Sequence, residues 1–455
     1  MLKRLLLPCS FLLMSSASFA QNEDSLMIRK LYNEALLRGQ SYENLRYLCK
    51  RIGHRLSGSP QAAAAVEYTY QVMKQFCDTV YLQECWVPHW VRGDKEIGRI
   101  SSVRQGAVNV KLCALGGSIA TPAAGISAEV VEVRSFEELD KLGKKGVQGK
   151  IVFFNHPFDN THIFTFHGYG EAVRYRWAGP SLAAKYGAVA SVTRSVTNTI
   201  DDHPHTGSIR YDTLYPAIPC AAICTRDAEV LSEIIRNEGK ANFLLQLNCR
   251  TLPDTRSYNV IGELRGSENP EQVIAVGGHL DSWDLGEGAH DDGAGCVQSI
   301  EVLRLFKAAG IRPKHTLRAV MFMNEENGLR GGLKYAEIAE KKKEKHLAAF
   351  ESDAGGFSPR GFGMTMKPEQ RSKVLSWKPL LEPYGIHDYG GGGGADIGPL
   401  EKQGVPLFGL HPDSQRYFDY HHTEIDVFEA INKRELELGG AAMAAMIYLI
   451  DRHGL

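Results

Sequence analysis

Residues 273–284 read VIAVGGHLDSWD and join a short apolar run to a cluster of polar side chains. Apolar runs of the same kind recur at 316–323, 347–350 and 405–410, with helical stretches between them. Continuous apolar strands that alternate with helices are typical of a parallel sheet covered on both faces. The sequence therefore predicts an α/β fold with a mostly parallel central sheet and helices on both faces.

The predicted strands, and the loop beyond the last one, lead into side chains that can bind a metal ion. They are His279, Asp281, Asp291, Glu325, Glu326, Asp353, His421 and His422. Active sites of open α/β sheets gather at the carboxyl ends of the strands. Taken singly, a His-x-Asp pair is usually a hydrogen-bonded pair, and Asp-Asp-Gly before a helix is usually a cap. Together, so many buried charges are costly without a counter-ion, and a pair of dications would neutralise them.

These residue types fit the chemistry of metal-assisted hydrolysis. Imidazole and carboxylate ligands without thiolate suit Zn²⁺, with Co²⁺ or Mn²⁺ as substitutes. A bridging carboxylate can give one oxygen to each ion, and the ions lower the pKa of a shared water towards neutrality. A second carboxylate must accept the proton of that water and pass it to the leaving amine. Adjacent glutamates can divide these tasks, and Asp281 is placed to orient the imidazole of His279.

The order of these motifs resembles the zinc aminopeptidase and glutamate carboxypeptidase family of metallopeptidases. The stretches that carry the resemblance at the predicted site are GHLDSWD (278–284), DDGAG (291–295), NEENG (324–328), ESDAG (351–355) and YHHT (420–423). Outside the site, RLSGS (55–59), VPHW (87–90) and PHTG (204–207) also match. The resemblance covers nearly all of the chain after its first twenty residues.

The resemblance implies a role for each site residue. The zinc ligands would be His279 and Asp353 for one ion, Glu326 and His422 for the other, and Asp291 as the bridge between them. Glu325 would be the general base and acid, and Asp281 would support His279. His421 falls where relatives carry a residue that polarises the scissile carbonyl, and we expect that role of it.

The expected function is hydrolysis of dipeptides or short peptides by a two-zinc exopeptidase. Two alternatives remain open: a receptor-like binding protein that has lost catalysis, and an acyl-transfer cyclase that keeps a single zinc on the same fold. The sequence also does not show which charged end of the substrate the enzyme recognises. Aminopeptidase, dipeptidase and carboxypeptidase activities therefore all remain candidates. A homodimer is implied by the resemblance alone.

The first twenty residues have the composition of an export signal. Lys3 and Arg4 precede an apolar run at 5–14, and small residues occupy the cleavage positions at 18–20. No later stretch reaches the roughly 18 uncharged apolar residues of a membrane span. We therefore expect a periplasmic or secreted protein with no membrane segment after the signal is cleaved.

The remaining chain divides into three parts by its pattern. Residues 21–124 form the N-terminal part of the peptidase domain, and residues 251–455 form its metal-binding core. Between them, residues 125–250 resemble the protease-associated domain that members of the family insert. Within the core, the run Gly390 to Gly394 lacks side chains, so its backbone can approach a substrate closely, although a mobile loop explains it as well.

Charge and cysteine content exclude other classes of function. Lys and Arg number 52 and Asp and Glu 53, so no basic field exists to hold nucleic acid. Nine cysteines in 455 residues are far fewer than a disulfide scaffold needs, and their spacing predicts no pairing.

Overall fold

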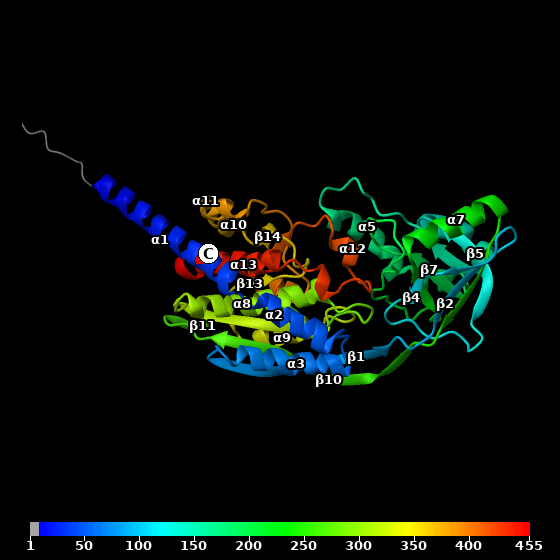
Figure 1. Ribbon diagram of the computed structural model, residues 1–455, viewed down its shortest axis with the longest axis horizontal. Helices are drawn as coiled ribbons and strands as arrows, with labels where there is room; N and C mark the ends of the chain where they lie inside the picture. Colours follow the sequence, from blue (N-terminus) through cyan, green and yellow to red (C-terminus); the bar gives the residue numbers. More distant parts are fainter. Residues whose placement is uncertain (1–8) are drawn as a thin grey trace, which may run out of the picture.

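The computed structural model describes residues 9–455, with side chains from residue 23 onward. The predicted export signal lies outside the described residues for its first eight positions, and the rest of it belongs to the helix α1 (Cys9–Arg38). Figure 1 shows two lobes, each built around a β-sheet, that lie side by side along the long axis of the molecule. Among the described residues, no helix is long and apolar enough to cross a membrane.

The first lobe contains a seven-stranded sheet in the order β1-β10-β12-β11-β13-β15-β14. Its strands are β1 (Thr79–Val91), β10 (Arg250–Leu264), β11 (Asn269–His279), β12 (His315–Phe322), β13 (Lys345–Glu351), β14 (Pro359–Thr365) and β15 (Leu407–Pro412). The four central strands are parallel, whereas β1, β10 and β14 pair antiparallel with their neighbours. The sheet is therefore mixed, which corrects the prediction of a mostly parallel sheet. Outer strands lack the continuous apolar run by which the central strands were found.

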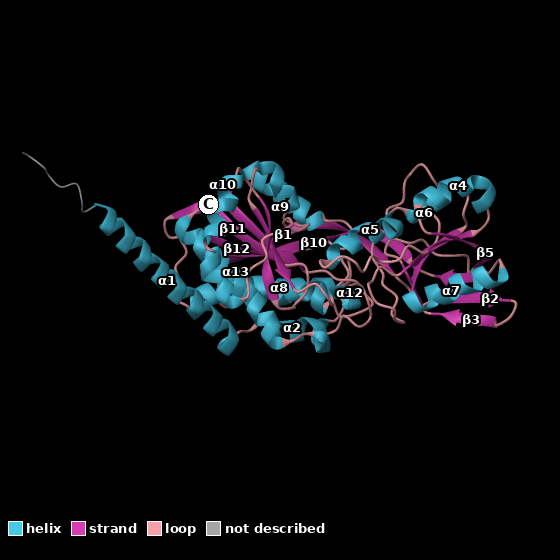
Figure 2. Ribbon diagram, turned by 90° about the horizontal axis from the view of Figure 1, so that it is seen from above, coloured by secondary structure: helices cyan, strands magenta, loops and turns pink. Residues whose placement is uncertain are grey.

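Helices cover both faces of this sheet, as Figure 2 shows. One face carries α1 together with α2 (Ser41–Tyr47), α3 (Pro60–Met73), α8 (Ala294–Ala308) and α13 (Lys433–His453), and the other carries α9 (Arg330–Lys342). Successive residues of β11 alternate between the two layers: Ile274 and Val276 join the core under α8, and Val273 and Ala275 join the core under α9. The α/β architecture predicted from the sequence is confirmed.

Shorter elements complete the first lobe. They are the α-helices α10 (Pro368–Ser376), α11 (Lys378–Leu381) and α12 (Tyr417–Tyr420), the π-helical turns Leu48–Ile52 and Ala289–Gly293, and the 3-10 turns Glu382–Tyr384, Gly398–Gln403 and Phe428–Ala430. The turn Ala289–Gly293 leads directly into α8. It places Asp291 close to the end of β11.

The second lobe contains an eight-stranded sheet in the order β3-β2-β9-β5-β6-β7-β8-β4. Its strands are β2 (Glu96–Ser102), β3 (Gly106–Val110), β4 (Leu112–Ala114), β5 (Ile126–Val133), β6 (Ile151–Phe154), β7 (Ala190–Arg194), β8 (Cys220–Ile223) and β9 (Asn242–Leu247). Its helices are α4 (Phe136–Val147), α5 (Thr165–Trp177), α6 (Gly179–Lys185) and α7 (Thr225–Glu238). The sheet begins at Glu96, before residue 125, where the sequence predicts that the insert starts. The pairing of β2 with the distant β9 leaves no local pattern in the sequence.

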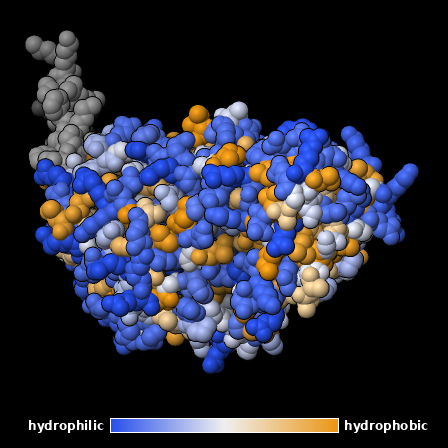
Figure 3. Space-filling model, turned by 45° about the vertical axis from the view of Figure 1, so that its right-hand side comes forward, coloured by the Kyte–Doolittle hydropathy of each residue, from blue (hydrophilic) through white to orange (hydrophobic). Residues whose placement is uncertain are grey.

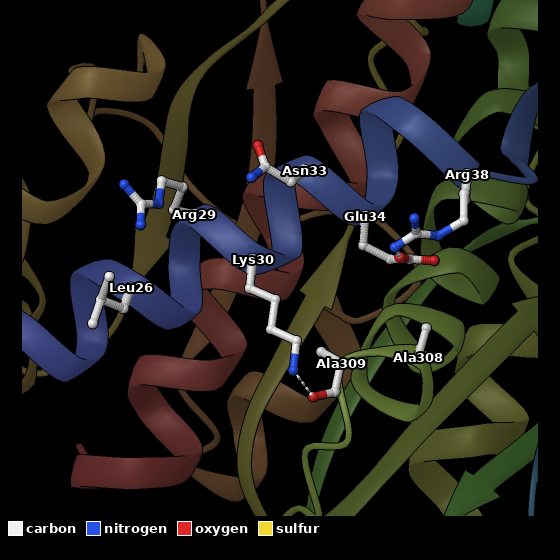
Figure 4. Close-up of a pocket in the computed structure, with 8 residues that line it drawn as sticks. All are labelled: Leu26, Arg29, Lys30, Asn33, Glu34, Arg38, Ala308 and Ala309. Atoms are coloured by element: carbon white, nitrogen blue, oxygen red, sulfur yellow. Dashed lines mark hydrogen bonds and ion pairs between the residues drawn. The ribbon is translucent and has the colours of Figure 1, made fainter.

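The helix α1 packs against the first lobe through polar and apolar contacts (Figure 4). The Nζ of Lys30 donates a hydrogen bond of 2.7 Å to the carbonyl of Ala309, just beyond α8. Glu34 lies between Arg38 of the same helix and Arg304 of α8. Lys30, Glu34, Arg38 and Ala309 line a hollow of about 250 Å³ that contains none of the predicted site residues. Figure 3 shows apolar residues distributed among hydrophilic ones over both lobes of the face in view.

Candidate metal centre

The structure brings the predicted metal ligands together at the carboxyl ends of the central strands. His279 ends β11, Asp353 follows β13, and Glu326 follows β12. Asp291 arrives from the turn before α8, and His422 from the loop after α12. Residues more than a hundred positions apart in the chain therefore meet at one edge of the sheet.

Asp291 lies between the two histidines. Its Oδ1 is 3.1 Å from Nε2 of His279, and its Oδ2 is 3.2 Å from Nε2 of His422. Each oxygen of one carboxylate thus faces a different imidazole. This arrangement is what a ligand shared between two neighbouring ions requires.

Each histidine has a further carboxylate beside it. Nε2 of His279 lies 3.4 Å from Oδ1 of Asp353, and Nε2 of His422 lies 3.1 Å from Oε2 of Glu326. Ligand atoms about 2.0–2.2 Å from a tetrahedral zinc ion are roughly 3.3–3.6 Å apart, close to these separations. The other oxygen of Glu326 is buried and has no hydrogen-bond partner among the described residues. The donor set and its spacing therefore fit zinc at two positions.

The pKa values of the carboxyl groups show that their negative charges repel one another within the cluster. Burial, and then the charges of Asp353 and Glu326, raise the pKa of Glu325 well above its ordinary value. Burial and the charge of Asp291 raise the pKa of Glu326 to about 7. Burial alone would also raise the pKa of Asp291, but its contacts with the two histidines lower it well below the usual range. A bound cation would relieve this repulsion.

The imidazole of His279 is oriented by a backbone group. Its Nδ1 lies 3.0 Å from the carbonyl oxygen of Asp281, whereas the carboxylate of Asp281 is 3.9 Å away. That carboxylate instead accepts hydrogen bonds from the backbone N–H groups of Asn324 at 2.6 Å and Glu325 at 3.0 Å. Asp281 therefore supports His279 through its main chain and fixes the loop of the two glutamates through its side chain.

This geometry predicts the effect of Asp281→Asn. The amide can keep the oxygen that accepts from Asn324 and Glu325, but its NH₂ group then faces the N–H of Glu326, which donates to the other carboxylate oxygen at 3.4 Å, so the loop that carries Glu325 shifts. We expect kcat/KM for the peptide hydrolysis that the family resemblance implies to fall by about 10- to 100-fold, the usual range for residues that support metal ligands. Zinc content should stay at the wild-type value, because the carbonyl that holds His279 is unchanged. A loss of zinc with unchanged kcat/KM per bound ion would contradict this role.

The second lobe orients His422. Nδ1 of His422 lies 3.1 Å from the carbonyl of Thr206, and the N–H of Thr206 donates to the carbonyl of His422 at 3.0 Å. Arg176 of α5 donates to the same Thr206 carbonyl at 3.2 Å. His422 has a φ of +64°, a region that L residues seldom adopt, so these contacts hold a costly backbone conformation. Thr206 lies in the matching stretch PHTG, but nothing in the sequence pattern predicts this role for it.

His421 lies beside the centre, and one of its ring nitrogens is within 4.8 Å of ligand atoms of Asp291 and His422, so it is within reach of a metal ion there. Its ring stacks on that of His422 with 3.5 Å between centroids, and its Nε2 is 3.7 Å from Oδ2 of Asp291. Burial, reinforced by His422, lowers the pKa of His421 well below its ordinary value. A neutral imidazole at this position can donate one hydrogen bond to a substrate oxygen.

The model of peptidase family M28 matches residues 259–447, the segment that carries all of these site residues except the supporting groups from the second lobe. Carboxypeptidase Q of Xenopus laevis is 40% identical to the chain over 415 residues, which cover 90% of this chain and 86% of the relative. The chain belongs to peptidase family M28. The resemblance inferred from the motifs, and the prediction of a peptidase, are confirmed.

Other members of the M28 family agree with this assignment. Carboxypeptidase Q of Homo sapiens is 37% identical over 413 residues, with 90% of this chain and 85% of the relative covered. The crystal structure of a peptidase M28 precursor from Shewanella amazonensis superposes with a TM-score of 0.89 at 32% identity and covers 95% of this chain and 97% of that chain. A zinc aminopeptidase from Bacillus subtilis has a TM-score of 0.64 at 20% identity, over 90% of this chain and 94% of that chain, and bears on the fold alone.

Proposed function

We propose that this M28 peptidase is an exported two-zinc exopeptidase that hydrolyses dipeptides or short peptides, with Glu325 as the general base. The observation that carries the proposal is the position of Asp291, whose two oxygens face His279 and His422 separately. His279 with Asp353, and His422 with Glu326, would complete the two metal positions. When bound there, zinc supplies a Lewis acid for the scissile carbonyl and lowers the pKa of the attacking water.

The chain's own residues would perform the proton transfers. Glu325 follows Asn324 in a loop whose backbone is fixed by Asp281. The charges of His279 and Asp353 affect the pKa of its carboxyl group, which therefore lies near these proposed ligands. Its raised pKa suits a group that accepts a proton from water and gives it to the leaving amine. His421, neutral and stacked on His422, would donate to the carbonyl oxygen as negative charge develops there.

The two alternatives make different demands on the site. A receptor-like protein that has lost catalysis needs a damaged centre, whereas all five proposed ligands converge here. The carboxyl group of Glu325 is close enough to Asp353 and Glu326 for their charges to raise its pKa. A single-zinc cyclase needs only one metal position. Metal analysis of the zinc-loaded chain by mass spectrometry separates the cyclase from the peptidase: two ions per chain support the peptidase, and one tightly bound ion favours the cyclase.

The test of the proposed activity is hydrolysis of unblocked, N-blocked and C-blocked dipeptides by the zinc-loaded chain. Cleavage that N-blocking abolishes would make the enzyme an aminopeptidase or a dipeptidase. Cleavage that survives N-blocking and is lost on C-blocking would make it a carboxypeptidase. If the chain binds zinc and cleaves none of these peptides, the proposed function is wrong.

The proposed role of His421 predicts a separate effect. In His421→Ala, the donor to the developing oxyanion is lost, and we expect kcat to fall by about 100- to 1,000-fold with little change in zinc content. The matched variant His422→Ala should lose both zinc and activity, because His422 would be a ligand. Kinetics and metal analysis of the two variants are compared directly. Near-normal turnover of His421→Ala would remove the oxyanion role.

A further inference from the structure

A second group of side chains that can bind a metal ion lies on the surface of the second lobe, where the loop after β6 meets α5. Asp159 and His162 belong to this loop, and Glu171 belongs to α5. One ligand atom from each of the three residues lies within 4.8 Å of the other two. This group shares no residue with the candidate metal centre, so it is a separate cluster.

A single imidazole nitrogen faces both carboxylates of the cluster. Nε2 of His162 lies 3.3 Å from Oε1 of Glu171 and 3.8 Å from Oδ2 of Asp159. Ligand atoms around a tetrahedral zinc ion are roughly 3.3–3.6 Å apart, so a small movement of Asp159 brings all three atoms to this spacing. Among the described residues, neither carboxylate has a lysine or arginine within ion-pair distance. No cation of the chain therefore neutralises the pair.

His167 offers a further ligand beside the cluster. It precedes Glu171 by four residues in α5, so the two side chains lie on the same face of the helix. Its ring is exposed, and its centroid is 5.6 Å from that of His162. Imidazoles and carboxylates without thiolate suit Zn²⁺ and the neighbouring divalent transition metals.

The loop that carries two of the ligands is held against α5. Oδ1 of Asp159 accepts a hydrogen bond of 2.8 Å from the N–H of Thr161, which leaves Oδ2 on the side of His162. A Cβ on Gly168 of α5 would lie 2.8 Å from the carbonyl oxygen of Asp159, so a larger residue there would push the loop away. Ligands that are already in position lose less conformational freedom when they bind an ion.

We infer that His162, Asp159 and Glu171 form a surface site for a divalent transition-metal ion such as Zn²⁺. His167 and water complete the coordination of the ion. Water can reach it because the side chains are partly exposed, 29% for His162 and 43% and 55% for the two carboxylates.

An ion at this site would connect the loop to α5 at a point close to the candidate metal centre. Phe164 and Phe166, at the start of α5, line a cavity of about 270 Å³ next to Asp353. The ring centroid of Phe164 lies 5.3 Å from that of His167. The ion would therefore restrict the segment that forms one wall of this cavity. The inference does not depend on the proposed function.

Zinc binding to the full chain tests this inference. The zinc-loaded protein is dialysed against a series of buffered free Zn²⁺ concentrations, and the zinc bound per chain is measured by mass spectrometry. The wild type is compared with His162→Ala and with Glu171→Gln, which keeps the shape of the side chain and removes its charge. Ions at the candidate metal centre cancel in this comparison, because its proposed ligands are the same in every variant.

His203→Ala is the matched control. His203 lies in the same lobe, its side chain is 28% exposed, and it also has two carboxylates beside it. These carboxylates face different ring nitrogens, Nε2 for Asp202 and Nδ1 for Glu424, so one ion cannot bind all three residues.

We expect the wild type and His203→Ala to bind one zinc ion per chain more than His162→Ala and Glu171→Gln, over the concentrations at which the site fills. Kd for this ion should rise by at least about 10-fold in the two variants, since loss of a ligand costs no less than loss of a residue that supports one. Equal zinc content and equal Kd in all four proteins would overturn the inference. A loss in His203→Ala as large as that in His162→Ala would overturn the assignment of the site as well.

Discussion

Glu325→Gln is expected to retain zinc and substrate binding while kcat falls by about 100- to 10,000-fold, the usual contribution of a general base. Glutamine has nearly the same shape as glutamate, but its amide cannot accept the proton of the attacking water at neutral pH. The backbone of residue 325 is held by Asp281, so the substitution leaves the loop in place. The measurement is steady-state hydrolysis of an unblocked dipeptide together with metal analysis of the same preparation.

Two further variants test whether the loss of kcat with retained zinc is specific to Glu325. Glu326→Gln removes a proposed ligand and should lower zinc content, whereas Glu325→Gln should not. Glu340→Gln changes an exposed carboxylate on α9 and should leave both zinc content and kcat at the wild-type values. If Glu325→Gln keeps more than about a tenth of the wild-type kcat, another group accepts the proton and the assignment of the base is wrong.

The arrangement of the candidate site could be predicted because its residues sit at the ends of buried strands. An apolar run such as 273–276 marks a central strand by itself, and the residue after it must emerge at the edge of the sheet. His279, Asp353 and Glu326 each follow such a run. Their convergence therefore follows from local patterns together with the general rule that parallel strands end at a common edge.

Other features depend on contacts between distant segments and left no local pattern. The antiparallel pairing of β1 with β10 joins the two lobes, and the sequence of β10 is largely polar and exposed at its beginning. Thr206 orients His422 with its carbonyl, a group that every residue has, so its identity predicts nothing about this role. The same holds for the carbonyl of Asp281 beside His279. Side-chain chemistry can be predicted from sequence, but backbone groups become visible only in the folded chain.

The second lobe thus contributes residues to the candidate site. Thr206 and Arg176 fix His422, and Phe164 and Phe166 close the cavity beside Asp353. Residues of both lobes therefore contribute to the candidate metal centre. The candidate centre is therefore complete only when the two lobes are packed together. Asp291 lies between both histidines, so we expect its substitution to disturb the centre most.

Asp291→Asn is expected to lower zinc content below two ions per chain and kcat/KM by at least about 1,000-fold, because the proposed bridge stabilises both metal positions and metal assistance is worth several kcal/mol. Asparagine fits the same space, but its NH₂ group cannot bind a cation, so residue 291 can supply an oxygen ligand to only one of the two metal positions. Metal analysis and dipeptide kinetics are measured together, with Asp254→Asn, an exposed position on β10, as the control. Retention of two ions and of wild-type kcat/KM in Asp291→Asn would show that the carboxylate is not shared, and the two-ion centre proposed here would then have to be abandoned.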